Sequence, residues 1–142
     1  HTDLNCLAVI QYAVDVLKVK HIMVVVHYGC GGVKAALERA RVGLVDLWLR
    51  HVQDVHVRHL QAVDTLPPEL RHDRLCELNA MHQVVNVCQP SVLREPWQRG
   101  QNVAVHGWCH SLQDGLVRDL GVSSRTREEA VERYRDAVER IG

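Results

Sequence analysis

The feature that most constrains the fold is a short apolar strand that runs directly into a glycine-rich turn and a helix. Residues 21–26 are mostly β-branched and contain no acidic side chain, which is typical of a buried strand with neighbours on both sides. The turn at 28–32 has the sequence YGCGG, and a helix is predicted from Val33 to Arg39. Such a unit is typical of α/β folds, whose ligand sites lie at the carboxyl ends of the strands.

Further helices are expected on either side of this strand. Their apolar spacing and end signals predict helices over residues 3–17, 44–60, 73–88, 91–97 and 126–141. The first helix has two apolar stripes, one containing Val14 and Leu17 and the other Val9 and Val16, so we expect it to pack on two sides. The helix over 44–60 is expected to direct Leu47, Val55 and Leu60 inward, and Thr126 with Glu129 forms a capping box.

The predicted sheet is too small for its helices. Besides 21–26, the sequence offers a second short strand at 103–106 and a weaker third around 116–122. A parallel sheet covered by helices on both faces usually has four or more strands. We therefore predict one α/β domain over residues 1–142, with a mostly parallel sheet flanked by helices, part of which is missing from this chain.

Composition excludes several classes of function. Seventeen basic and seventeen acidic residues balance, and no basic run is present, which argues against a nucleic-acid partner. The longest strongly apolar run, 22–26, is too short to cross a membrane. The five cysteines are odd in number and irregularly spaced, which favours free thiols in a reducing compartment, and we expect a cytoplasmic protein.

His27 and Cys30 are the leading candidate metal ligands. They follow the predicted strand as His27-Tyr-Gly-Cys30, where a tight turn can direct an imidazole and a thiol at one ion. Zinc accepts mixed nitrogen and sulfur ligands in a tetrahedron. Cys30 also precedes a helix, whose N-terminus favours a thiolate. Gly31 and Gly32 let the backbone approach a small bound molecule, so they are candidates for a substrate pocket.

Spacing alone leaves alternatives open. His106 with Cys109, placed at a predicted strand end, and His72 with Cys76, on one helical face, are further pairs. All three pairs have the alternative of ordinary packing. Cys6 is the candidate for a third ligand, but its position near the start of a helix favours a small hydrophobic core residue.

Several blocks of the sequence resemble the β-class carbonic anhydrases, most closely the bacterial branch that is regulated by bicarbonate. These blocks are HTDLNCL at 1–7, QYAVDVL at 11–17, HYGCGGV at 27–33, LCELN at 75–79, RGQ at 99–101 and HGW at 106–108. In that family a CxDxR segment precedes the HxxC motif, and zinc is held by the first cysteine, the histidine and the second cysteine. The resemblance therefore makes His27 and Cys30 zinc ligands. It also implies that this chain is the C-terminal two-thirds of the fold, because the CxDxR segment is not in it.

The resemblance implies a function and partners. The expected reaction is the reversible hydration of carbon dioxide to bicarbonate by zinc-bound hydroxide, in a homodimer or homotetramer whose active site lies near the dimer interface. Tyr12 matches an aromatic position of that interface, although a core helix tyrosine is an equal alternative. His110 stands where the regulated branch has a tyrosine, which makes it a possible regulatory position. The alternatives are an inactive fragment or subunit that retains the fold, and a structural zinc module.

Overall fold

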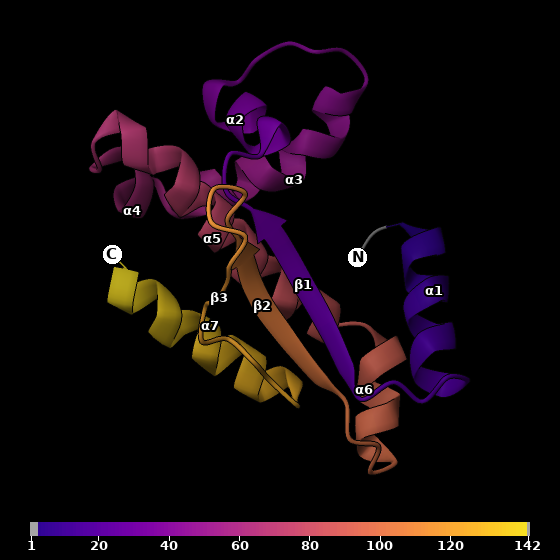
Figure 1. The fold of residues 1–142 in the computed structure, drawn as a ribbon. Coiled ribbons are helices and arrows are strands. Elements are labelled where there is room, and N and C mark those ends of the chain that lie inside the picture. Colours follow the sequence, from indigo (N-terminus) through magenta and orange to yellow (C-terminus); the bar gives the residue numbers. More distant parts are fainter. Residues whose placement is uncertain (1–2, 142) are drawn as a thin grey trace.

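The computed structural model describes residues 3–141 and has the α/β class that the sequence predicts (Figure 1). In chain order its elements are α1 (Leu4–Asp15), β1 (His21–His27), α2 (Gly31–Glu38), α3 (Val45–Arg58), α4 (Leu60–Asp64), α5 (Pro68–Cys88), α6 (Ser91–Gln98), β2 (Ala104–His110), β3 (Val117–Asp119) and α7 (Arg127–Ile141). Over these residues no helix is both long and apolar enough to cross a membrane.

The sheet has the order β1-β2-β3. β1 and β2 are parallel and pair from His21 with Ala104 to His27 with His110, whereas β3 is antiparallel to β2. The second strand is longer than the predicted 103–106, because its register with β1 continues to His110. The third strand lies within the predicted 116–122. Within residues 3–141, β1 has a strand on one side only, so the expectation of neighbours on both sides is not met.

One face of the sheet packs on α5. The apolar spacing of this helix predicts a buried face of Leu75, Leu78, Val85 and Cys88, and all four are buried. Val84, outside that predicted set, is fully buried as well. The helix begins at Pro68, five residues earlier than expected, since a proline in the first helical turn loses no hydrogen bond there. Helix and sheet therefore form the main core.

Gly107 is the point of closest approach between this helix and the sheet. A Cβ built on Gly107 would lie 2.5 Å from Val122 Cγ2 and 2.9 Å from Val84 Cγ2. Both neighbours are fully buried, so they have little room to move. Only a glycine fits beneath α5 at this position of β2.

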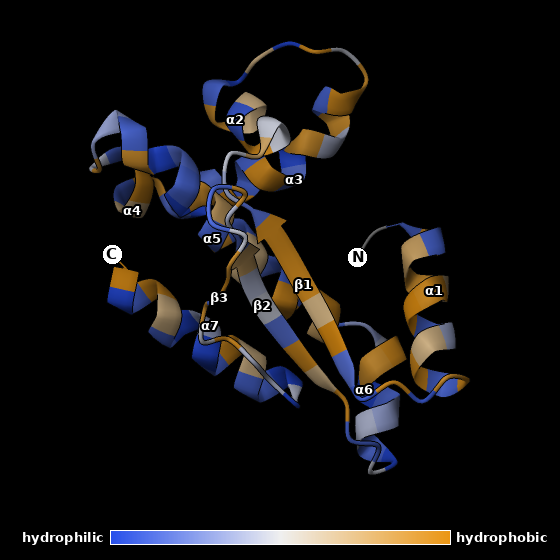
Figure 2. Cartoon of the chain, viewed as in Figure 1, coloured by the Kyte–Doolittle hydropathy of each residue, from blue (hydrophilic) through white to orange (hydrophobic). Residues whose placement is uncertain are grey.

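The opposite face of the sheet is open in the described chain. Met23 and Val25 of β1 are 59% and 49% exposed, so the prediction of a buried strand is wrong for this face. Their partners in β2, His106 and Trp108, are half-buried on the same side of the sheet. Figure 2 shows β1 as a mainly hydrophobic arrow with this uncovered face.

α1 packs on one side rather than on the predicted two. Asp3 caps it by accepting a hydrogen bond from the Cys6 backbone N–H (3.0 Å), and Val14 is fully buried. Val9 and Val16, the second apolar stripe, are exposed, and the helix ends before Leu17, which is exposed as well. Nothing within residues 3–141 covers that second stripe.

The helix predicted over 44–60 is two helices. The chain leaves helical geometry at His59 (φ −126°, ψ 32°), between α3 and α4. Val55 is buried as expected, but Leu47 and Leu60 are exposed, so their predicted inward direction is wrong. The break changes the direction of the chain, which separates the apolar positions that one continuous helix would have aligned.

α7 begins with the predicted capping box in a modified form. The Glu129 backbone N–H donates to Thr126 Oγ1 (3.1 Å), while the Glu129 carboxylate accepts from the Arg125 N–H (2.8 Å), one residue before the usual donor. Ala130 and Ala137 are buried against the main core.

The close approach at Gly107 predicts a specific loss of stability. Gly107→Ala should lower the free energy of unfolding by about 1–3 kcal/mol, because the new methyl group overlaps two buried valines. Denaturant unfolding followed by circular dichroism measures the change. Gly31→Ala is the matched control, since a Cβ there meets no atom within 4 Å and stability should be unchanged or slightly higher. Equal effects of the two variants would contradict the packing argument.

The uncovered strand predicts self-association of the 142-residue chain. An apolar strand with an unpaired edge is a template for other chains, so the isolated chain should associate. Val25→Lys should reduce that association in sedimentation experiments, whereas Val131→Lys, on the surface of α7, should not. A parent chain that is monomeric at the same concentration would contradict this prediction.

Candidate metal centre

His27 and Cys30 belong to one tight turn at the carboxyl end of β1. His27 is the last residue of the strand and Cys30 is the N-cap of α2. Gly29 between them has φ +73°, a left-handed conformation that favours glycine. Both donor side chains are half-buried. The strand, the turn and the helix that the sequence predicts therefore meet at these two residues.

The hydrogen bond of His27 decides which ring nitrogen is available to a ligand. Its Nδ1 lies 2.9 Å from the carbonyl oxygen of Tyr28, which can only accept. Nδ1 therefore carries the proton, and Nε2 keeps its lone pair. Histidines that bind metals typically donate their other N–H to a carbonyl or carboxylate in this way, which fixes the ring orientation.

Helix α5 holds the backbone at Cys30 through a hydrogen bond. His72 Nε2 donates to the carbonyl oxygen of Cys30 at 2.9 Å. The Cys30 side chain makes no capping hydrogen bond to α2, so its sulfur is not engaged by that helix. A helix N-terminus stabilises a nearby negative charge, which suits a thiolate ligand.

The two donors fit zinc, but they do not complete a site. Nitrogen from His27 and sulfur from Cys30 are a mixed set that zinc accepts, while a catalytic zinc takes three protein ligands. Among residues 3–141, no group of three or more His, Cys, Asp or Glu side chains could hold a metal ion.

The other two His/Cys pairs do not form metal sites. His106 and Cys109 lie inside β2 rather than at its end, and residues three apart in a strand face opposite sides of the sheet. His72 Nε2 lies 4.0 Å from Cys76 Sγ but is used by the Cys30 carbonyl, and burial raises the pKa of the Cys76 thiol to about 12.

Cys6 and Tyr12 are both on the surface of α1. Cys6 is exposed and lines a hollow of about 360 Å³ with Trp48, His51 and residues of α5, so its predicted core role is wrong. Tyr12 is 56% exposed, which rules out a core tyrosine within the described chain. Neither side chain belongs to the turn that carries His27 and Cys30.

The predicted pocket glycines and His110 adjoin the candidate ligands. Gly31 opens α2, where an added Cβ would meet nothing, and an added Cβ at Gly32 would lie 3.4 Å from Leu49. Their lack of a side chain is therefore not required by packing. His110 is the strand partner of His27, so the position expected to be regulatory lies directly beside a predicted ligand.

Sequence reasoning missed a polar cluster beneath the same turn. The Tyr28 hydroxyl donates to Glu77 Oε1 (2.7 Å), and the Arg118 guanidinium lies over the Tyr28 ring, 5.7 Å from its centroid. Burial, followed by the Glu77 carboxylate, holds the pKa of Tyr28 well above its usual range. These residues line a hollow of about 500 Å³. Tyr28 lies in the turn after β1, Glu77 in α5 and Arg118 in β3, and no spacing in the sequence predicts their contact.

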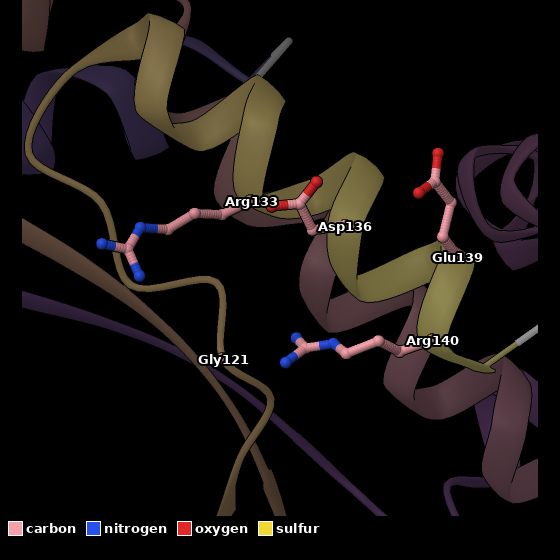
Figure 3. A pocket seen from close by; sticks show the side chains of 5 residues that line it. All are labelled: Gly121, Arg133, Asp136, Glu139 and Arg140. Atoms are coloured by element: carbon pink, nitrogen blue, oxygen red, sulfur yellow. The ribbon is translucent and has the colours of Figure 1, made fainter.

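A second charged hollow lies away from the predicted site. Its volume is about 470 Å³, and Figure 3 shows Arg133 and Arg140 reaching from α7 toward the loop at Gly121. Asp136 and Glu139 complete the lining, so both signs of charge are present. None of the predicted site residues lines it.

The chain matches a known family model and several curated proteins. The model described as carbonic anhydrase matches residues 1–117. A carbonic anhydrase of Emericella nidulans is 40% identical over 121 residues, which cover 84% of this chain and 53% of that protein. One of Pseudomonas aeruginosa is 30% identical over 122 residues, covering 83% of this chain and 54% of the relative. The chain thus spans about half the length of these relatives.

Solved structures share the fold. A Coccomyxa β-carbonic anhydrase in complex with acetazolamide has a TM-score of 0.85 at 36% identity, over 92% of this chain and 60% of that one. The β-carbonic anhydrase CafA of Aspergillus fumigatus has a TM-score of 0.81 at 32% identity, over 95% and 64%. A tetrameric β-carbonic anhydrase of Sordaria macrospora has a TM-score of 0.79 at 35% identity, over 87% and 63%.

The burial of the cysteines predicts which thiols react. Burial raises the pKa of Cys76 and Cys88 to about 12 and that of Cys109 to about 11, so these thiols are protonated and inaccessible at pH 8. Brief treatment of the metal-free folded chain with iodoacetamide should alkylate Cys6 and Cys30 alone, as measured by peptide mass spectrometry. The urea-unfolded chain is the control, in which all five should react. Labelling of Cys76 before Cys30 in the folded chain would contradict this arrangement.

Proposed function

This chain belongs to the carbonic anhydrase family, and we propose that it supplies two protein ligands of a zinc site that hydrates carbon dioxide reversibly. The observation that carries the proposal is the turn at the end of β1. There His27 has its Nδ1 proton committed to a carbonyl, and Cys30 follows at the start of α2. The donor types, their common turn and the available Nε2 all suit zinc.

In this proposal each residue of the turn has a defined task. His27 binds through Nε2, Cys30 binds through Sγ, and His72 holds the backbone of Cys30 in place. A zinc ion supplies the chemistry by lowering the pKa of a water ligand to about 7. Gly31 and Gly32 leave the backbone accessible to carbon dioxide and bicarbonate beside the ligands.

A third ligand comes from outside residues 3–141. We propose that it is the cysteine of a CxDxR segment, carried on a strand that pairs with the free edge of β1. Two observations support this assignment. β1 is an edge strand despite its apolar sequence, and the chain covers about half the length of its curated relatives. The strand would place its cysteine next to the carboxyl end of β1, where His27 lies.

The partner and regulation predictions belong to the same proposal. An exposed Tyr12 suits a place in a homodimer or homotetramer interface, and one structural neighbour is described as tetrameric. His110 beside His27 suits a regulatory role, at the position where the bicarbonate-regulated bacterial branch has a tyrosine. The five free cysteines suit a cytoplasmic protein.

Zinc content and carbon dioxide hydration test the proposal together. We expect His27→Gln and Cys30→Ser each to reduce zinc content strongly in the protein that contains this chain, and to reduce stopped-flow hydration by at least about 100-fold. His51→Gln is the matched control, because it changes a histidine of α3 outside the turn and should preserve zinc content and rate.

The outcomes separate the alternatives. Zinc bound through His27 and Cys30 without any hydration activity in the assembled protein would favour an inactive subunit. Four protein ligands in X-ray absorption spectra, with unfolding on chelation, would favour a structural zinc module. Full zinc content in both ligand variants would overturn the assignment.

A further inference from the structure

A pair of histidines lies at the other end of β1, away from the candidate zinc ligands. His21 begins β1, and His106 is on the neighbouring strand β2, diagonally across from it. His21 Nδ1 and His106 Nε2 are 3.0 Å apart, and the two rings stack with centroids 5.2 Å apart. The two residues are 85 positions apart in the sequence, so the fold alone creates this pair.

Two further contacts, with Ser123 and Trp108, hold the His106 ring in place. Its Nδ1 lies 2.9 Å from Ser123 Oγ, and the Trp108 ring centroid lies 5.4 Å from that of the imidazole. The Ser123 hydroxyl can accept from an Nδ1 proton, which leaves the Nε2 lone pair directed toward His21. This arrangement parallels the outer hydrogen bond that orients a metal-binding histidine.

The surroundings of His106 lower its pKa and so favour the neutral ring. Burial lowers its pKa first, His21 lowers it further, and Arg125 adds to the effect, while Asp119 acts in the opposite direction. In the neutral ring the Nε2 lone pair accepts from His21 Nδ1, and an ion that replaces this contact reaches it from the open face of the sheet within the described chain.

We propose that His21 Nδ1 and His106 Nε2 bind a divalent cation of the zinc, nickel and copper class, with water completing its coordination. Two bonds of about 2.0–2.1 Å at a tetrahedral angle place the nitrogens about 3.3 Å apart, so the observed 3.0 Å needs only a small opening. Imidazole nitrogens select this class of ion, while calcium and magnesium prefer oxygen ligands.

Neutral His21 and His106 can bind the ion together without releasing a proton to the solvent. Each neutral imidazole carries one proton, and in the ion-free pair His21 Nδ1 donates its proton to His106 Nε2 in a hydrogen bond. When the ion takes one nitrogen from each ring, the His21 proton moves from Nδ1 to Nε2. The remaining protons lie on His21 Nε2 and on His106 Nδ1, where Ser123 accepts. Protonation of either ring competes with the ion, so affinity falls as the pH is lowered.

The site is separate from the proposed zinc centre. His21 and His27 are the two ends of β1, which places them roughly 20 Å apart at about 3.3 Å per residue. It does not depend on the proposed function, and it has two protein ligands where catalytic zinc has three. Bound metal would join β1 to β2 and stabilise the sheet, because the unfolded chain lacks the pair.

Nickel binding followed by tryptophan fluorescence tests the site. The background is the protein that contains this chain, with Cys6→Ser and Cys30→Ser, which removes the two accessible thiols of the chain and disables the proposed zinc centre. Ni²⁺ should quench the fluorescence of Trp108, which lies beside His106. His21→Asn should abolish the saturable quenching at low Ni²⁺ concentration, whereas His51→Asn, on α3, should leave it unchanged.

Two more variants separate binding from its optical signal. Trp108→Phe should remove most of the quenching while calorimetry still detects one Ni²⁺ per chain. Ser123→Ala should weaken Ni²⁺ by about tenfold. Each variant is first checked by circular dichroism to be folded. Unchanged nickel affinity in His21→Asn, or equal losses in His21→Asn and His51→Asn, would overturn the proposal.

Discussion

The parallel ladder between β1 and β2 is the interaction on which the rest of the structure depends. Its register sets His27 beside His110 at one end and places His21 diagonally opposite His106 at the other. α5 fixes the ladder from one face through Gly107, where Val84 and Val122 leave no room for a side chain. A shift of one residue in this register would turn every side chain of β1 to the other face. Both candidate metal positions would be lost together.

The open face and the free edge of β1 have a common cause in the sequence. The strand 21–27 carries apolar residues on both faces, which suits a central strand, yet it has one neighbour within residues 3–141. Exposed Met23 and Val25, and the uncovered side of α1, are therefore surfaces whose composition suits contact rather than water. This mismatch is consistent with the length comparison, in which the relatives are about twice as long as the matched region.

Sequence patterns predicted the elements better than their contacts. The apolar run and the YGCGG turn identified β1, α2 and the two ligand candidates, because strand and turn signals are local. The helix break at His59 was missed, since α3 and α4 share an apolar spacing that one helix could also have. The length of β2 was missed because its register depends on a partner far along the chain.

In the candidate site too, the sequence predicted the positions of residues better than their contacts. The position of His27 and Cys30 followed from local sequence, whereas the contacts that orient them did not. His72 reaches the Cys30 carbonyl and Glu77 reaches the Tyr28 hydroxyl only because α5 crosses beneath the turn. The pair His106 and Cys109 misled because a spacing of three residues brings side chains together in a turn but separates them in a strand.

The long sequence separation between paired strands has a consequence for how the protein is made. At a synthesis rate of roughly 5–20 residues per second, the 85 residues between His21 and His106 take about 4–17 s to be translated. Throughout that interval β1 has left the ribosome without the strand it pairs with, while its apolar side chains are already in solution. We therefore expect a chaperone to bind nascent β1 more readily than other segments of this chain.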